Sequence, residues 1–242
     1  MTILVLGGTG ATGRLLVKQL LEKGERVKVI VRSAERLPEE VLNHPNLTII
    51  EASLLELSDA ELIKHVNRCG AVVSCLGHNL TIKGLFGQPR KLVRDAVRRV
   101  CAVITATNPA EPVKFVLMNT TGNSNRDLDE PIPFGQKIVL GLIRVLLPPH
   151  SDNEQAADHL RVQIGQKNSH INWVAVRPDG LIDEDKVSEY TTHRSPTRSP
   201  IFNAGKTSRI NVAHFMADLI TEEAIWQEWK GQMPVIYNPG YA

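Results

Sequence analysis

The stretch that decides the fold reads Leu4-Val5-Leu6-Gly7-Gly8-Thr9-Gly10-Ala11-Thr12-Gly13-Arg14. Its glycines follow the pattern Gly7-x-x-Gly10-x-x-Gly13, after an apolar run that predicts a buried strand and before a predicted helix. Gly7 permits a tight turn, Gly10 lets the backbone approach a pyrophosphate, and Gly13 lets the helix pack close to the strand. The N–H groups at the start of the helix then face the anion. This context predicts a dinucleotide-binding loop; the alternative is a tight turn without a ligand.

Outward from this loop, short β-branched runs alternate with longer stretches of helical periodicity. Continuous apolar strands separated by helices predict a doubly wound α/β fold, in which helices cover both faces of a parallel sheet. The expected strands are Thr2–Leu6, Arg26–Val31, Leu47–Ile50, Ala71–Leu76, Lys114–Met118 and Asn172–Val176, and the expected helices are Ala11–Lys23, Glu35–Leu42, Asp59–Val66, Pro89–Ala106 and Asn153–Gln166.

The length and composition fit one such domain. The 242 residues have a hydrophobic fraction of 42% and a charged fraction of 22%, as in ordinary globular proteins. We expect a single Rossmann domain over residues 1–242, with substrate-side insertions near 122–150 and 179–206, where Gly, Pro, Ser, Asn and Asp follow the fifth and sixth strands.

Charge and cysteine usage narrow the classes of partner. The 28 basic against 26 acidic residues leave a net charge of +2, too small a surplus to favour nucleic-acid binding. Cys69, Cys75 and Cys101 form no Cys-x-x-Cys pair, and no histidine spacing predicts a metal site, so we expect a reducing, cytoplasmic setting and no metal. The apolar segment Ile138–Leu147 falls short of the ~20 residues of a membrane span, and no membrane partner is expected.

Two arginines after the second strand bear on the choice of dinucleotide. Arg32 stands where an acidic residue would bind the ribose 2′-hydroxyl of NAD, and Arg36 follows one helical turn later. Because arginine pairs with a 2′-phosphate, these residues predict NADP as NADPH. The alternative is a pair of solvated surface arginines, and Glu35 between them would weaken an anion site.

The sequence resembles the atypical short-chain dehydrogenase/reductase superfamily, in its NAD(P)H-binding, NmrA-like and biliverdin-reductase-B-like branch. The resemblance covers nearly the whole chain. It rests on the glycine loop and on Val31-Arg32-Ser33, Ser74-Cys75-Leu76-Gly77, Met118-Asn119-Thr120-Thr121-Gly122, Trp173-Val174-Ala175-Val176-Arg177-Pro178 and Ser208-Arg209-Ile210-Asn211-Val212-Ala213.

The resemblance implies a set of cofactor contacts. Within the loop, Thr9, Ala11 and Thr12 would line the pyrophosphate together with the glycines. Ser53 and Leu54 would lie beside the adenine, although Ser53 departs from the Asp that the family usually has there. The remaining positions are Leu76, Gly77 and His78 near the adenosine ribose, Asn119 and Thr120 near the nicotinamide, and Pro178 below it.

The catalytic pattern of the family is missing. Typical short-chain dehydrogenases use Tyr-x-x-x-Lys, and none of Tyr190, Tyr237 and Tyr241 has a lysine four residues later. Its place is taken by His150-Ser151-Asp152-Asn153-Glu154. In one interpretation His150 is a polar residue after two prolines, with Ser151 or Asp152 capping the next helix. In the other, His150 donates a proton near the nicotinamide and Thr120 supplies the hydrogen bond of the usual serine.

The apolar segment Ile138–Leu147 predicts a buried helix, while a wall of the substrate pocket or a dimer interface stays open. These observations predict an NADP-dependent oxidoreductase that transfers a hydride to a small carbonyl, quinone, flavin or conjugated substrate. The competing class is a non-catalytic NADP(H)-binding redox sensor with a regulatory protein partner. A sugar-nucleotide epimerase is disfavoured because it needs the same missing tyrosine and lysine.

Overall fold

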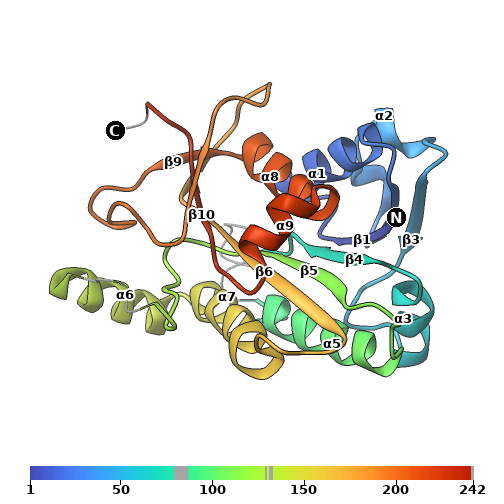
Figure 1. The fold of residues 1–242 in the computed structure, drawn as a ribbon, viewed down its shortest axis with the longest axis horizontal. Coiled ribbons are helices and arrows are strands. Elements are labelled where there is room, and N and C mark those ends of the chain that lie inside the picture. The colour runs from blue at the N-terminus through green and yellow to red at the C-terminus, as the bar shows by residue number, and fades with distance from the viewer. Residues whose placement is uncertain (79–86, 129, 131–132, 241–242) are drawn as a thin grey trace.

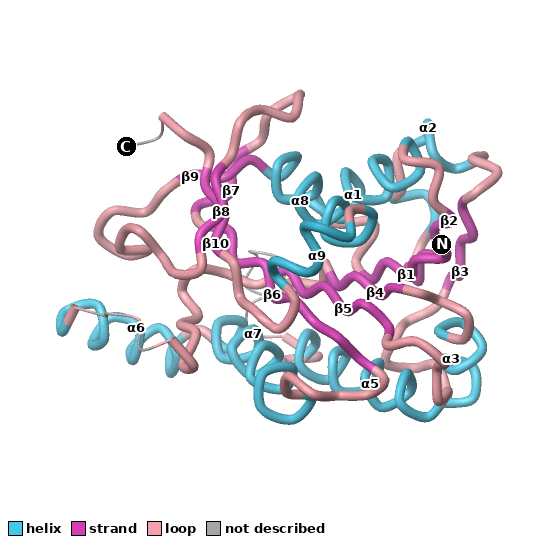
Figure 2. Tube along the Cα trace, in the orientation of Figure 1, coloured by secondary structure: helices cyan, strands magenta, loops and turns pink. Residues whose placement is uncertain are grey.

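The central feature of the fold is an eight-stranded sheet (Figures 1 and 2). The computed structural model describes residues 1–78, 87–128, 130 and 133–240. All neighbouring strands of the sheet are parallel except the last pair, which is antiparallel. The order is β3 (Leu47–Glu51), β2 (Arg26–Val31), β1 (Thr2–Leu6), β4 (Ala71–Ser74), β5 (Val113–Met118), β6 (Ile171–Pro178), β10 (Val235–Tyr237) and β8 (Thr191–His193).

Helices cover both faces of the sheet, as Figure 2 shows. Along β1, Ile3 and Val5 enter one hydrophobic core while Leu4 and Leu6 enter the other, because successive side chains of a strand point to opposite faces. The first core contains side chains of α1 (Ala11–Glu22), α8 (Arg209–Thr221) and α9 (Glu223–Trp229), and the second those of α3 (Asp59–Val66), α5 (Leu92–Ala106) and α7 (Pro148–Asp158). The expected doubly wound α/β plan is confirmed.

Proline residues explain why two helices differ from their expected bounds. The helix expected at Glu35–Leu42 is two short pieces, η1 (Ala34–Arg36) and α2 (Glu39–Leu42), because Pro38 forces an extended residue before it. The helix expected at Asn153–Gln166 begins earlier, since Pro148 and Pro149 suit its first turn, and ends in a π-helical segment, η2 (His159–Ile164).

The carboxyl-terminal third contains strands that the sequence pattern did not predict. Besides β8 and β10, β7 (Gly180–Ile182) and β9 (Lys206–Ser208) pair in a separate two-stranded sheet. All four are three residues long, too short to show a periodicity. The insertion expected near 179–206 therefore contains short strands, and β8 joins the main sheet through β10, which pairs with β6.

The helix expected to be buried carries exposed leucines. It forms α6 (Phe134–Leu146), which extends away from the sheet in Figure 1 and packs mainly against α7. The Leu142 and Leu146 side chains are 56% and 63% exposed, so the prediction of burial was wrong for these residues. In the described part of the chain, no helix has the length and apolar character needed to cross a bilayer.

Arg177, at the end of β6, joins the loops around this edge of the sheet. Its side chain is fully buried, and its five N–H groups donate to Glu130 and to the carbonyl oxygens of Met233, Asn123 and Arg194. The ion pair with Glu130 is bidentate, with distances of 2.7 and 3.0 Å. A buried cation satisfied in this way fixes every segment that it touches.

We therefore expect the variant Glu130→Ala to lower the free energy of unfolding by about 3–5 kcal/mol, because it leaves the Arg177 charge buried without its counter-ion. Denaturant unfolding measures the change. The matched control is Glu56→Ala at an exposed position, with an expected change within about 0.5 kcal/mol. A loss below about 1 kcal/mol for Glu130→Ala would contradict this account of Arg177.

Candidate functional site

The order of the strands reverses between β1 and β4, and this switch point is where open α/β sheets bind ligands. The loops that follow the two strands touch each other. A Cβ placed on Gly7 would lie 2.7 Å from the carbonyl carbon of Cys75, so only glycine fits there. The glycine loop and residues 75–78 thus form two adjoining walls at the carboxyl edge of the sheet.

The glycine loop has the geometry of a phosphate cradle. Gly7 has a φ of +76°, its carbonyl oxygen accepts from Gly10 N at 2.9 Å, and a Cβ on Gly13 would lie 2.1 Å from that same oxygen. Gly10 is the N-cap of α1, and since it has no side chain, it leaves the first N–H groups of the helix to an incoming anion. Thr12 is buried and Ala11 exposed. These residues fit a dinucleotide pyrophosphate.

The two arginines of the predicted 2′-phosphate site are both exposed beyond β2. Arg36 lines a cavity of about 360 Å³ together with Arg14 and Lys18 of α1. Lys18 pairs with Glu40 at 3.0 Å, whereas Arg14 adds a second guanidinium group to the lining of the cavity. Sequence reasoning missed Arg14, although its place directly after the last glycine was the available signal.

The two residues predicted to lie beside the adenine, Ser53 and Leu54, differ in their burial. Ser53 is half-buried, and its carbonyl oxygen accepts from Glu56 and Leu57 in a turn. Leu54 is 9% exposed and packs in the core beside α3 and α5. Its side chain contributes more to that core than to an open surface.

Residues 76–78 reach the same edge after β4, and His78 is turned inward. Its Nε2 lies 2.8 Å from Asp152 Oδ2, and its side chain is 6% exposed. The half-buried Leu76 and the exposed Gly77 precede it. Since the imidazole faces Asp152, a contact of this segment with a ribose falls to Leu76, Gly77 and the backbone.

Asp152 caps a helix, but not the one that the sequence predicted. It lies in the second turn of α7, and its carboxylate accepts from the backbone N–H groups of Val93 and Arg94 at 2.8 and 2.9 Å, at the start of α5. A carboxylate at a helix N-terminus is stabilised by the unpaired N–H groups there. The expectation that it caps its own helix was wrong. The long sequence separation hid its role.

Asn119 follows β5 and is held on all sides. Its Oδ1 accepts from Thr120 N at 2.8 Å and from Asn123 Nδ2, and its Nδ2 donates to Asn153 O at 3.0 Å. Thr121 N donates to the carbonyl oxygen of the buried Pro178, which joins the ends of β5 and β6. The side-chain oxygen and nitrogen of Asn119 are therefore used to hold the loop against α7, and these are the atoms that a contact with the nicotinamide would need.

The predicted catalytic pair comes together around Gly122. A Cβ on Gly122 would lie 3.1 Å from His150 Cε1 and 3.8 Å from Thr120 Oγ1. Thr120 Oγ1 accepts from Gly122 N at 3.3 Å, and both side chains are half-buried. Burial lowers the pKa of His150 below its usual value, with Glu154 opposing and Arg144 reinforcing the shift. Burial therefore favours the neutral form of the imidazole.

Asp179 is a carboxylate at this edge that sequence reasoning missed. It directly follows Pro178, and its Oδ2 accepts from Gly205 N at 2.8 Å. Burial raises the pKa of Asp179, while hydrogen bonds from Gly205, Thr121 and Gly180 oppose the shift. Its position one residue after the Val-Arg-Pro motif was the only signal, and it ties the loop before β9 to the end of β6.

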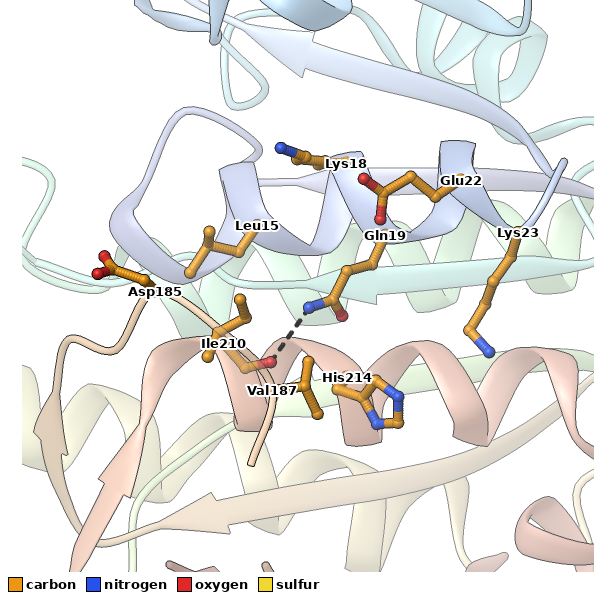
Figure 3. A pocket seen from close by; sticks show the side chains of 9 residues that line it. All are labelled: Leu15, Lys18, Gln19, Glu22, Lys23, Asp185, Val187, Ile210 and His214. Atoms are coloured by element: carbon orange, nitrogen blue, oxygen red, sulfur yellow. Dashed lines mark hydrogen bonds between the residues drawn. The ribbon is translucent and has the colours of Figure 1, made fainter. Parts of the chain in front are cut away.

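A second cavity, of about 460 Å³, lies between α1 and α8 (Figure 3). Leu15, Ile210 and Val187 form its apolar part, and Lys18, Lys23, Glu22 and Asp185 add charges of both signs. Gln19 bridges the two helices through Nε2 and the carbonyl oxygen of Ile210 at 3.2 Å. None of the residues predicted to bind the cofactor lines it.

The thiols are no part of this site. Cys69 and Cys101 are buried, and burial raises the pKa of Cys75 to about 12, so its thiolate is scarce at neutral pH. Among the residues that the structure describes, no group of three His, Cys, Asp or Glu side chains is arranged to hold a metal ion.

Solved structures share the fold at low sequence identity. A short-chain dehydrogenase/reductase from Veillonella parvula in complex with NADP matches with a TM-score of 0.71 and 17% identity, over 99% of this chain and 95% of that one. The oxidoreductase ylbE from Lactococcus lactis matches with a TM-score of 0.70 and 16% identity, over 100% and 93%. A Rossmann-fold NAD(P)-binding family protein from Shigella flexneri gives 0.65 and 20%, over 99% and 94%.

The sequence itself matches the NAD(P)H-binding family over residues 7–223, a range that starts in the glycine cradle and ends after α8. With the cradle at the switch point of the sheet and most of its length matched, this chain belongs to the NAD(P)H-binding family.

Proposed function

We propose that the protein is an NADP-dependent oxidoreductase that reduces a small carbonyl, quinone, flavin or conjugated substrate. The observation that carries the proposal is the meeting of His150 and Thr120 beside Gly122, at the same edge of the sheet as the glycine cradle. A titratable group and a hydroxyl beside a nicotinamide site are the parts that a reductase needs.

The choice of NADP rests on charge. Arg32 and Arg36 are exposed in the segment after β2, and Arg36 shares a cavity with Arg14. Guanidinium groups bind phosphate through charge-assisted hydrogen bonds, whereas a ribose 2′-hydroxyl gains little from them. These arginines favour a nucleotide with a 2′-phosphate.

At the other end, the side chains act on the substrate oxygen. NADPH, when bound, supplies the hydride that reduces the substrate. The Thr120 hydroxyl donates a hydrogen bond to the substrate oxygen and orients it. The protonated His150 gives its proton to that oxygen as negative charge develops, and water restores the proton afterwards. A quinone, which needs less help from an acid than a ketone, would depend less on His150.

A second function is favoured by one specific observation, the absence of a Tyr-x-x-x-Lys pair from the sequence. Without that pair, the chain would bind NADP(H) and report its redox state to a protein partner, as a sensor. Titration with NADPH and NADH, followed by nicotinamide absorbance with quinones, flavins and aldehydes, separates the two functions. NADPH binding without turnover of any substrate favours the sensor, and binding of neither nucleotide excludes both.

Replacing Arg32 tests the cofactor. The variant Arg32→Ala should weaken NADPH binding by about 10- to 100-fold and leave NADH binding nearly unchanged, because a charged hydrogen bond contributes about 1.5–3 kcal/mol. Fluorescence titration gives both dissociation constants. Arg26→Ala, at the exposed opposite end of β2, is the matched control and should change neither. An equal loss for both nucleotides would assign Arg32 a role other than 2′-phosphate binding.

Replacing His150 tests the proton donor. Because burial lowers the pKa of His150, the proton is lost at a lower pH than from a free imidazole, and the rate of reduction should be highest below that pKa and fall above it. His150→Gln should lower kcat by about 10²- to 10⁴-fold for an aldehyde and flatten the pH profile, with the NADPH dissociation constant retained. His159→Gln, another half-buried histidine with a lowered pKa, is the control. An unchanged kcat would remove His150 from the mechanism.

A further inference from the structure

An exposed apolar surface lies beside the candidate site. On α6, Leu142 and Leu146 stand 56% and 63% exposed, and the neighbouring Leu147 37%. Phe202, in the loop before β9, is 65% exposed. Leucine and phenylalanine side chains gathered this way are costly in water and mark an interaction surface. We call these four residues the α6 surface.

The loop that carries Phe202 and the start of α6 are joined. The Phe202 ring lies 3.8 Å from the position of a Cβ on Gly135, and Ser199 Oγ donates to Gln136 Oε1 at 2.7 Å. Figure 1 shows this loop beside α6, away from the central sheet. Two segments far apart in the sequence thus present their apolar side chains from one region of the molecule.

The two chain segments that carry this surface contain basic residues and no acidic ones. No Asp or Glu occurs between residues 131 and 151 or between 190 and 217, although the whole chain has 26 acidic residues against 28 basic ones. Arg194 and Lys206 are exposed in the second segment, while Arg144 pairs with Glu154 and Arg209 with Asp183. The cations of the two segments are Lys137, Arg144, Arg194, Arg198, Lys206 and Arg209.

We propose that the α6 surface binds the protein peripherally to an anionic lipid bilayer. Apolar anchors flanked by basic residues are the combination that holds a helix in the headgroup region of such a bilayer. A helix of 13 residues is about 20 Å long, which is enough to lie in that region and too short to span ~30 Å of hydrocarbon. The lack of a spanning segment does not exclude this peripheral mode of binding, so the proposal replaces the expectation of no membrane partner.

A second copy of this chain fits the α6 surface less well than a lipid bilayer does. Two-fold pairing through the α6 surface would bring two copies of the basic segments 131–151 and 190–217 together, with no carboxylate in either segment to oppose their cations. Lipid phosphates oppose these cations directly. Because His150 follows Leu147 by three residues, docking would also bring the candidate site close to apolar molecules dissolved in the bilayer. The docking itself does not depend on the proposed reduction.

Vesicle co-sedimentation of the full chain tests the proposal. The protein should sediment with vesicles of phosphatidylcholine mixed with phosphatidylglycerol, and at least about tenfold more weakly with phosphatidylcholine alone. The double variant Leu142→Glu/Leu146→Glu should lose at least about tenfold in vesicle affinity, since it removes both anchors and adds anionic repulsion. Val162→Glu is the matched control, because Val162 is also 56% exposed and lies on η2. NADPH binding should stay unchanged in both variants, which shows that they fold.

A second readout follows the anchor itself. The three native tryptophans are buried, so Phe202→Trp adds an exposed reporter whose emission should shift to the blue with the mixed vesicles. No sedimentation of the wild-type chain, an equal loss in Val162→Glu, or equal binding to phosphatidylcholine alone would overturn the proposal. So would self-association in velocity sedimentation that Leu142→Glu/Leu146→Glu abolishes while vesicles remain unbound.

Discussion

The ligand edge of this protein depends on one buried cation. Arg177 uses all five N–H donors within the protein, on segments that include the loop after β5, the segment between α9 and β10 and the loop after β8. The backbone of these segments has few regular partners of its own, because the strands there are only three residues long. A desolvated guanidinium needs each of these acceptors, so the loops are held in the positions that satisfy it.

A second constraint acts on the other side of the edge and has the opposite charge. Asp152 is buried, and its carboxylate is stabilised by the N-terminus of α5 and by His78. This pairing fixes α7 against α5 and thereby fixes His150, two residues earlier on the same helix. The position of the candidate proton donor is thus set by a contact between residues 59 positions apart in sequence, Asp152 and Val93.

The parts of the fold that the sequence predicted well are those with local causes. The glycine loop, β1 and β2 follow from the residue types within a few positions, and their predicted bounds agree with the structure. The capping role of Asp152 could not be predicted, because its partners are brought to it by the fold. The exposure of α6 had a different cause: apolar composition predicts burial only if another element covers the helix, and composition does not show whether one does.

The same contrast between local and long-range causes explains why the sequence predicts a cofactor site but not a substrate. A cofactor phosphate meets backbone N–H groups, and a glycine pattern in the sequence is enough to show where these are free. A substrate would meet side chains from β5, α7 and the loops that Arg177 holds, and their arrangement has no counterpart in a short motif. Those loops also bear Phe202 and lead into α6. The proposed membrane-binding surface and the entrance to the candidate site therefore depend on the same segments. The α6 surface that these segments carry is apolar, and residues 131–151 and 190–217 around it contain no Asp or Glu.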